Sequence, residues 1–315
     1  MSIAVSILIS THNRAEILRK TLDSVAALRV GDPAGVEVIV VINACTDSTA
    51  EVVASMAAGF PFALRSFIEP TPGLSIARNR CMAEARGEIF AFIDDDVRVE
   101  PDWLAALLET YRTTNADMVG GPVTLWWDAV AQPDWFDPAF EYLLSAIDNG
   151  PADKRLTTTD QVYGANFSIR RKVWQAIGGF NPAFGRKGKQ LGSGEEGEFF
   201  DRALRHGFTL WYSAKATLKH WVIPSRVSID YLTGVATGNG YAEVVRGHDR
   251  LTSRIVLHGL YYNTRWAIGY PIIAWREERK GNPRGAFRAK VLASAARGRL
   301  KGLLHWLQPG ADHNT

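Results

Sequence analysis

Three consecutive carboxylates, Asp94, Asp95 and Asp96, follow an apolar run at residues 89–93. Alternate residues of a strand point to opposite faces, so we expect Asp94 and Asp96 on one side and Asp95 on the other. Two converging carboxylates suit Mg²⁺ or Mn²⁺, which prefer oxygen ligands and commonly share substrate phosphates. The alternative is an Asp-rich turn that caps the next helix. These residues are therefore the first candidates for a metal site.

Alternating strand and helix patterns would position these carboxylates. Strands are predicted from apolar runs at 5–9, 36–42, 62–68 and 89–93, and helices from apolar spacing at 15–28, 50–58 and 75–85. This alternation predicts an α/β fold with a Rossmann-like, mostly parallel sheet flanked by helices. Such sheets bind ligands beyond the carboxyl ends of their strands. The polar loops that follow these strands should therefore meet at one site.

Composition narrows the class of protein. The chain has 315 residues, of which 46% are hydrophobic, and a formal net charge of +3, which fits a globular protein with one large core or two modest ones. Cys45 and Cys81 are the two cysteines and form no CxxC motif, so we expect a reducing, cytoplasmic setting. The first nine residues lack a positive leader region and read as a buried strand.

Several motifs in order carry a family resemblance. They lie at residues 5–14, 37–47, 73–79, 92–96, 178–180, 194–196 and 211–220. Together they resemble family 2 glycosyltransferases with the GT-A fold, over roughly the first 230 residues. The resemblance implies a catalytic domain at 1–225, with a nucleotide-sugar half at about 1–97 and an acceptor half at about 98–225. A helical, basic C-terminal extension follows at 226–315.

The resemblance implies an enzyme that transfers a sugar, with inversion, from a nucleoside diphosphate sugar to an acceptor hydroxyl. It adds His220 to Asp94 and Asp96 as a ligand of Mg²⁺ or Mn²⁺, although an isolated histidine is often only packed or capping. Inversion needs one base opposite the leaving group, and Glu196 is the candidate, with Glu195 the alternative. Glu196 stands where the family commonly has Asp. Both glutamates could also simply begin a helix, where carboxylates favour the helix dipole.

Donor-binding residues follow from the same resemblance. They are Thr11, Asn13 and Arg14 after the first strand, Asn43 and Asp47 after the second, Arg78 and Asn79 near the diphosphate, and Asp94 and Asp95 at the metal loop. Many family members carry Asp where this chain has Ile42, which leaves uridine recognition less secure. For Arg78 and Asn79, the alternative is an ordinary polar helix face.

The acceptor is expected to be a polysaccharide or lipid-linked glycan. A helix at 103–112 and a strand at 117–125 are predicted to precede an aromatic loop at 126–140. Aromatic rings in this loop could stack on sugar faces, or could equally pack in a core. These rings belong to Trp126, Trp127, Trp135 and Phe136. Asn166 is a further residue expected to line the site.

The C-terminal segment from residue 287 mixes apolar residues with arginine and lysine in an amphipathic pattern. This composition suits a helix on an anionic membrane surface, and hence a peripheral location at the inner face of the cell membrane. The alternative is a helix packed on protein with its charges solvated. The apolar stretch at 255–275 contains polar residues and Pro271, which argues against a spanning helix. No nucleic-acid-binding motif accompanies the basic residues.

Two other functions remain open from the sequence. A sugar nucleotidyltransferase would use a similar sheet and metal, but residues 10–15 lack the glycines of its phosphate loop. A non-catalytic protein of the same fold could bind a nucleotide sugar or a partner, and Ile42 favours it. The paired aspartates and glutamates argue against that reading.

Overall fold

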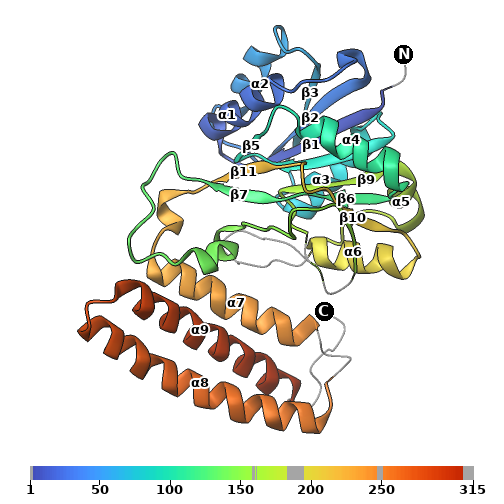
Figure 1. Cartoon of the computed structure of the whole chain (residues 1–315). Coiled ribbons are helices and arrows are strands. Elements are labelled where there is room, and N and C mark those ends of the chain that lie inside the picture. The colour runs from blue at the N-terminus through green and yellow to red at the C-terminus, as the bar shows by residue number, and fades with distance from the viewer. Residues whose placement is uncertain (1–2, 158–159, 161, 183–194, 247–250, 308–315) are drawn as a thin grey trace. The chain divides into compact units, whose positions relative to one another are not determined.

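The computed structural model describes residues 3–157, 160, 162–182, 195–246 and 251–307. The chain forms two compact units (Figure 1). The first comprises Met1–Trp126 and Ser145–Trp221, and the second comprises Trp127–Leu144 and Val222–Thr315. The division into catalytic domain and extension near residue 225 remains a prediction about function.

The main sheet of the first unit has eight strands in the order β3-β2-β1-β4-β9-β6-β10-β8. β9 runs antiparallel to β4 and β6, and β8 runs antiparallel to β10, whereas the other neighbours are parallel. The bounds are β1 Val5–Thr11, β2 Val36–Asn43, β3 Ala63–Glu69, β4 Ile89–Asp94, β6 Met118–Gly120, β8 Lys154–Leu156, β9 Asn166–Arg170 and β10 Leu210–Tyr212. The predicted α/β class with a mostly parallel sheet is confirmed.

Helices cover both faces of this sheet. Two apolar cores form because strand residues alternate: Val5, Ile7 and Ile9 of β1 join one core, and Leu8 joins the other. The first core includes residues of α1 (Ala15–Ala26), α2 (Thr49–Ala57) and α4 (Trp103–Thr114). The second includes residues of α3 (Leu74–Glu84), α5 (Arg171–Ile177) and α6 (Glu195–Arg205). The sheet is thus buried on both sides, which leaves its strand ends for ligands.

The single strand predicted at 117–125 is wrong. The chain forms β6 in the main sheet and then β7 (Val123–Trp126) in a second sheet of order β5-β11-β7. Pro122 interrupts the strand because it lacks an N–H for the ladder. Gly121 is needed there because a Cβ would overlap the Ala216 carbonyl oxygen. The second sheet also contains β5 (Val97–Val99) and β11 (Leu218–Trp221), which flank the predicted metal residues.

The second unit is mainly three long helices, α7 (Ile229–Arg246), α8 (Ser253–Arg279) and α9 (Pro283–Trp306), with the short helix η2 (Pro138–Leu144). Within this unit α9 lies between α7 and α8 (Figure 1). Gly298 of α9 approaches the α7 backbone at Thr237, and Leu303 of α9 packs against Gly259 of α8. The predicted C-terminal helical region is therefore present. Two further short helices are η1 (Pro33–Gly35) and η3 (Pro224–Arg226).

Several apolar residues of α9 are buried inside the second unit. Phe287, Val291 and Leu303 are buried, whereas Arg297 and Lys301 are exposed. Other parts of the second unit cover these three apolar side chains, whereas Leu304 is exposed, so membrane binding through this segment remains a prediction. Among the described helices, none combines the length and apolar character needed to cross a bilayer.

Candidate active site

The three aspartates lie where β4 ends. β4 stops at Asp94, and Asp95 and Asp96 form a turn into β5, so the expected strand alternation does not continue through Asp96. The turn is held from α1: the Thr21 hydroxyl donates to the Asp95 carbonyl oxygen at 2.9 Å and accepts from the Val97 N–H at 3.2 Å. Asp94 and Asp96 nevertheless share one site.

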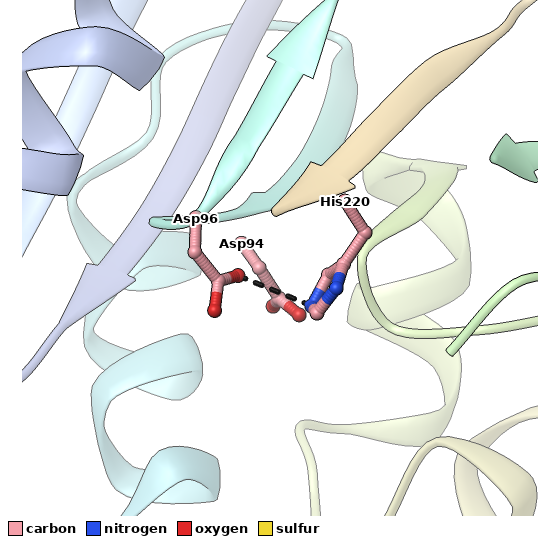
Figure 2. A group of neighbouring side chains, drawn as sticks. All are labelled: Asp94, Asp96 and His220. Carbon is pink, nitrogen blue, oxygen red and sulfur yellow. Dashed lines mark ion pairs between the residues drawn. The ribbon is translucent and has the colours of Figure 1, made fainter. Parts of the chain in front are cut away.

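Strand β11 places His220 beside this turn. β11 pairs antiparallel with β5, with His220 opposite Val97, and the Trp221 N–H donates to the Asp96 carbonyl oxygen at 2.8 Å. His220 Nε2 consequently lies 3.3 Å from Asp96 Oδ1. Figure 2 shows Asp94 and Asp96, from the end of β4 and the turn after it, converging with His220 of β11.

This group of three side chains fits a divalent ion. One ligand atom from each of Asp94, Asp96 and His220 lies within 4.8 Å of the others. Ligands about 2.1 Å from a shared octahedral ion are about 3 to 4 Å apart, so small side-chain movements are sufficient. Among the described residues, His220 Nδ1 is buried without a hydrogen-bond partner, whereas buried polar atoms are normally bonded. Two carboxylates with one imidazole accept Mn²⁺ as well as Mg²⁺.

Arg14 holds the other side of the aspartate turn. Its Nη1 lies 2.7 Å from Asp95 Oδ1 and 2.5 Å from Asp96 Oδ2. Burial alone would lower the pKa of Arg14, but Asp95 and Asp96 outweigh it and hold that pKa above its ordinary value. Burial raises the pKa of Asp95 to about 6, against the opposing effect of Arg14. Arg14 is thus a permanent cation at the edge of the candidate metal site.

Arg78 connects the aspartates with the acidic start of α6. Its Nη1 lies 2.9 Å from Glu196 Oε1 and 3.2 Å from Glu195 Oε1, and its Nη2 lies 3.4 Å from Asp94 Oδ1. Burial alone would lower the pKa of Arg78, but Glu196, Asp94 and Glu195 outweigh it and raise that pKa. The Glu195 side chain is 3% exposed and the Glu196 side chain 19%. Of the two, Glu196 is therefore the one that a substrate can reach.

The glutamate pair begins a helix, as the alternative anticipated, and its role as the base remains a prediction. Glu195 and Glu196 form the first turn of α6, where free backbone N–H groups favour negative charge. They also face Arg78 and, through it, Asp94. Gly194, which precedes them in the motif, lies outside the described residues. The helix start and the acidic site are consequently one structural feature.

The roles of two residues were not predicted from the sequence. Gly164 lies so close to this cluster that a Cβ would overlap Glu196 Oε1 and Arg78 Nη2. The Thr21 hydroxyl stabilises the aspartate turn through the two hydrogen bonds described above. Thr21 offered a signal, since it is a polar residue on the apolar face of its helix. Gly164 offered none before the position of Glu196 was known.

Three of the predicted donor-binding residues form hydrogen bonds that hold the loops at the carboxyl ends of β1 and β2. Asn13, which has a φ of 53°, accepts from the Thr46 N–H at 2.7 Å. Asn43 accepts from the Gly73 N–H at 2.9 Å and donates to backbone carbonyls. Asp47 accepts from the Thr49 N–H at 3.2 Å at the start of α2. They shape the loops that face the candidate site, and direct contact with a donor remains a prediction.

The other residues predicted to bind the sugar donor are buried or already form hydrogen bonds within the protein. Thr11 is buried at the end of β1, and Ile42 is buried beside it in β2, where it offers no polar group. Asn79 accepts from the Phe180 N–H and donates to the Phe180 carbonyl oxygen, both at 2.8 Å. Asn79 therefore anchors the Gly179–Phe180 segment, and its contact with a diphosphate is untested.

The predicted acceptor residues separate into different environments. Asn166 is buried; its side chain accepts a hydrogen bond from the Trp103 indole and donates to the carbonyl oxygens of Pro122 and Ala216. The expectation that Asn166 lines the site is therefore wrong. Phe136 is also buried and packs on Phe287 within the second unit, as the alternative of core packing anticipated. Partly exposed rings remain at Trp126, Trp127 and Trp135. A role for these in acceptor binding remains a prediction.

Comparison with known proteins identifies relatives along the whole chain. A family model described as glycosyl transferase family 2 matches residues 6–178. The succinoglycan biosynthesis protein ExoM of Rhizobium meliloti is 33% identical, over 99% of this chain and 97% of its own length. The glucosyl-dolichyl phosphate glucuronosyltransferase of Haloferax volcanii is 30% identical over 55% of each chain.

Solved structures share the fold. A mannosyltransferase from Pyrobaculum calidifontis, in complex with GDP-Man and Mn²⁺, has a TM-score of 0.59 at 18% identity, covering 94% of this chain and 86% of that one. Residues 1–349 of S. aureus TarS, in complex with UDP, have a TM-score of 0.55 at 16% identity, covering 94% and 90%. These likenesses confirm the predicted GT-A type of fold with its C-terminal helical region.

Proposed function

The chain belongs to glycosyl transferase family 2 and is a glycosyltransferase, and from that premise we propose that it moves a sugar, with inversion, from a nucleoside diphosphate sugar to a hydroxyl of a polysaccharide or lipid-linked glycan. One observation carries this proposal: the buried Arg78 contacts both Asp94 of the candidate metal group and Glu196 at the start of α6. The groups that the proposal assigns to holding the leaving diphosphate and to accepting the proton are thereby adjacent.

In this proposal Asp94, Asp96 and His220 hold Mg²⁺ or Mn²⁺. When bound, the ion would stabilise the negative charge that develops on the diphosphate leaving group. Arg14 lies at the same edge and can donate to a phosphate oxygen. Support comes from the close approach of the three ligand atoms. The Mn²⁺ bound by the Pyrobaculum mannosyltransferase agrees with this choice of ion.

Glu196 is the proposed base. In a single displacement, the acceptor oxygen bonds to the anomeric carbon while the bond from that carbon to the diphosphate oxygen breaks. The hydroxyl proton passes to a carboxylate within hydrogen-bond reach. Glu196 keeps some exposure, whereas Glu195 is almost fully buried against Arg78. Arg78 orients Glu196, and Glu195 supports Arg78.

The proposed acceptor class and location rest on the relatives. ExoM is named for succinoglycan biosynthesis, and the Haloferax enzyme for a glucosyl-dolichyl phosphate. A glycan acceptor, free or linked to a lipid, follows for this chain as part of the proposal. A chain that meets such an acceptor would work in the cytoplasm, peripheral at the inner face of the cell membrane.

Calorimetric titration with UDP, GDP, dTDP and CDP tests the donor site, each with and without Mn²⁺. The variant is Asp96→Ala, and the matched control is Asp134→Ala, an exposed aspartate in the second unit. The proposal predicts Mn²⁺-dependent binding of one nucleotide, retained in Asp134→Ala and lost in Asp96→Ala. Binding of none of the four, or equal binding by Asp96→Ala, would overturn the assignment of a metal-dependent donor site.

A further inference from the structure

Helix α8 is an edge helix of the second unit with an uncovered apolar surface. It packs on α9 through an inward stripe that includes Val256, Asn263 and Ala274, spaced by seven and eleven residues. In the described part of the chain, nine of the fourteen exposed large apolar side chains belong to α8. Scattered exposed apolar residues are normal, but a concentration on one helix marks an interaction surface.

Two apolar stripes flank the outer side of α8. Residues seven or eleven apart return to the same helix face. The first stripe is Ile255, Tyr262, Trp266 and Ile273, and the second is Leu257, Tyr261, Ile268 and Trp275. All eight are exposed, with Ile268 at 63% and Trp275 at 50%. Both stripes therefore offer rings and aliphatic chains to a partner.

A basic ridge runs between the stripes. Arg254, His258, Arg265 and Arg276 follow one another at intervals of four, seven and eleven residues, so they share one face, and all are exposed. From residue 253 to residue 276 the helix contains no aspartate or glutamate. Beyond the ridge, the Arg279 guanidinium lies 4.2 Å from the centre of the Trp275 ring. The outer face thus combines positive charge with tyrosine and tryptophan.

We infer that α8 is the membrane-contact surface of this chain and lies along an anionic lipid surface, with Arg265 and Arg276 at the phosphate headgroups and Tyr262 and Trp266 in the interfacial layer. Tyrosine and tryptophan favour that layer because one end of each ring is apolar and the other is polar. Arginine beside an anionic leaflet gains from its surface potential, and its apolar stem can remain among lipid chains. The helix is about 40 Å long at 1.5 Å per residue, which gives the ridge and the stripes an extended line of contact with a lipid surface.

The charge of α8 favours a lipid surface over a second copy of the chain as its partner. A symmetric pairing through α8 would bring the basic ridge against itself, and like charges in contact oppose association. A lipid surface instead supplies negative charge along the whole ridge and apolar chains on both sides. The inference deepens the peripheral membrane location proposed above and assigns it to α8, since the apolar residues of α9 are largely buried.

Vesicle flotation of the full chain tests the inference, with phosphatidylcholine vesicles compared with vesicles that also contain phosphatidylglycerol. The variants are Arg265→Gln with Arg276→Gln, and Tyr262→Ser with Trp266→Ser. The matched control is Arg297→Gln with Lys301→Gln, two exposed basic residues of α9. Circular dichroism establishes that each variant keeps its helices.

Wild type should bind the anionic vesicles and bind phosphatidylcholine weakly. Loss of two arginines should reduce partitioning about twenty-five-fold, because each basic side chain contributes about a fivefold factor near such a surface. The aromatic variant should lose at least about tenfold, and the α9 control should change less than about twofold. Equal binding to both vesicle types, or an equal loss in the α9 control, would overturn the inference.

Two further measurements, fluorescence and light scattering, test whether α8 contacts lipid or a second copy of the chain. A fluorophore on Ile268→Cys, in a Cys45→Ser background, should shift to the blue with anionic vesicles, and one on Arg297→Cys should not. Light scattering that shows a dimer dispersed by Tyr262→Ser with Trp266→Ser would instead identify a second copy as the occupant. Vesicle binding requires neither donor nor metal, so its failure would leave the proposed sugar transfer standing, and the converse also holds.

Discussion

Arg78 Nη1 lies 2.9 Å from Glu196 Oε1, and the other terminal nitrogen of Arg78 lies 3.4 Å from Asp94 Oδ1. One buried guanidinium therefore links the proposed base with the candidate metal group. Such a fork holds two carboxylates at fixed geometry, which a lysine could not do. The two halves of the proposed reaction consequently depend on the same side chain.

The two glutamates should respond differently to loss of charge. Glu196→Gln should lower transfer by about 10²- to 10⁴-fold and leave nucleotide affinity unchanged, because a positioned base contributes that much. Glu195→Gln should mainly lower the free energy of unfolding, by about 2 kcal/mol, because it removes a buried charged hydrogen bond to Arg78. Single-turnover transfer, nucleotide titration and chemical unfolding measure these effects. The reverse pattern would identify Glu195 as the base.

Gly164→Ala tests whether the position of the Arg78–Glu196 pair matters. The added methyl group would overlap Glu196 Oε1 and Arg78 Nη2 and displace both. Displacement of a reacting group by about 1 Å can reduce the rate about 10²-fold, and we expect a loss of that size in transfer. Gly31→Ala is the control, since an added Cβ there meets nothing within 4 Å. Similar activities of the two variants would contradict the proposed geometry.

Asp117 provides a pH-dependent test of the fold away from the site. Burial would raise the pKa of Asp117, but Lys172 and Thr209 outweigh it and hold that pKa below its ordinary value. A depressed pKa means that the stabilisation is present above the unfolded pKa and is lost as the pH falls through the folded pKa. Asp117→Asn should therefore lower the free energy of unfolding by about 1 kcal/mol at pH 7.

That difference from wild type should shrink as the pH falls below about 4, where the unfolded carboxyl begins to bind protons. Urea unfolding at several pH values measures it. Asp134→Asn, at an exposed position, should show no such trend. A difference that stays constant with pH would show that Asp117 acts through packing rather than charge.

The sequence was sufficient for the first half of the fold. Buried runs and helical spacing predicted the strand-helix alternation of β1 to β4, because each element has a strong local period. The position of His220 beside Asp96 depended instead on the pairing of β11 with β5, between residues more than a hundred positions apart. Motif resemblance supplied it where local pattern could not.

Other features could not be predicted because they depend on three-dimensional packing. The role of Gly164 follows from where Glu196 and Arg78 come to lie. The burial of Asn166 follows from three hydrogen bonds to distant segments. The amphipathic pattern of α9 identified an apolar face correctly, but not which helices cover it. The exposed apolar stripes of α8 could be identified only from the structure, which shows how the three helices pack.

The central claim is that Asp94, Asp96 and His220 form a metal centre that serves the donor. Electron paramagnetic resonance of Mn²⁺, in the presence of UDP or GDP, measures its affinity for wild type, Asp96→Asn and His220→Gln, with Asp134→Asn as the control. The account predicts that the dissociation constant for Mn²⁺ rises at least about tenfold in both site variants and is unchanged in the control. Equal Mn²⁺ affinity in wild type, Asp96→Asn and His220→Gln would contradict it.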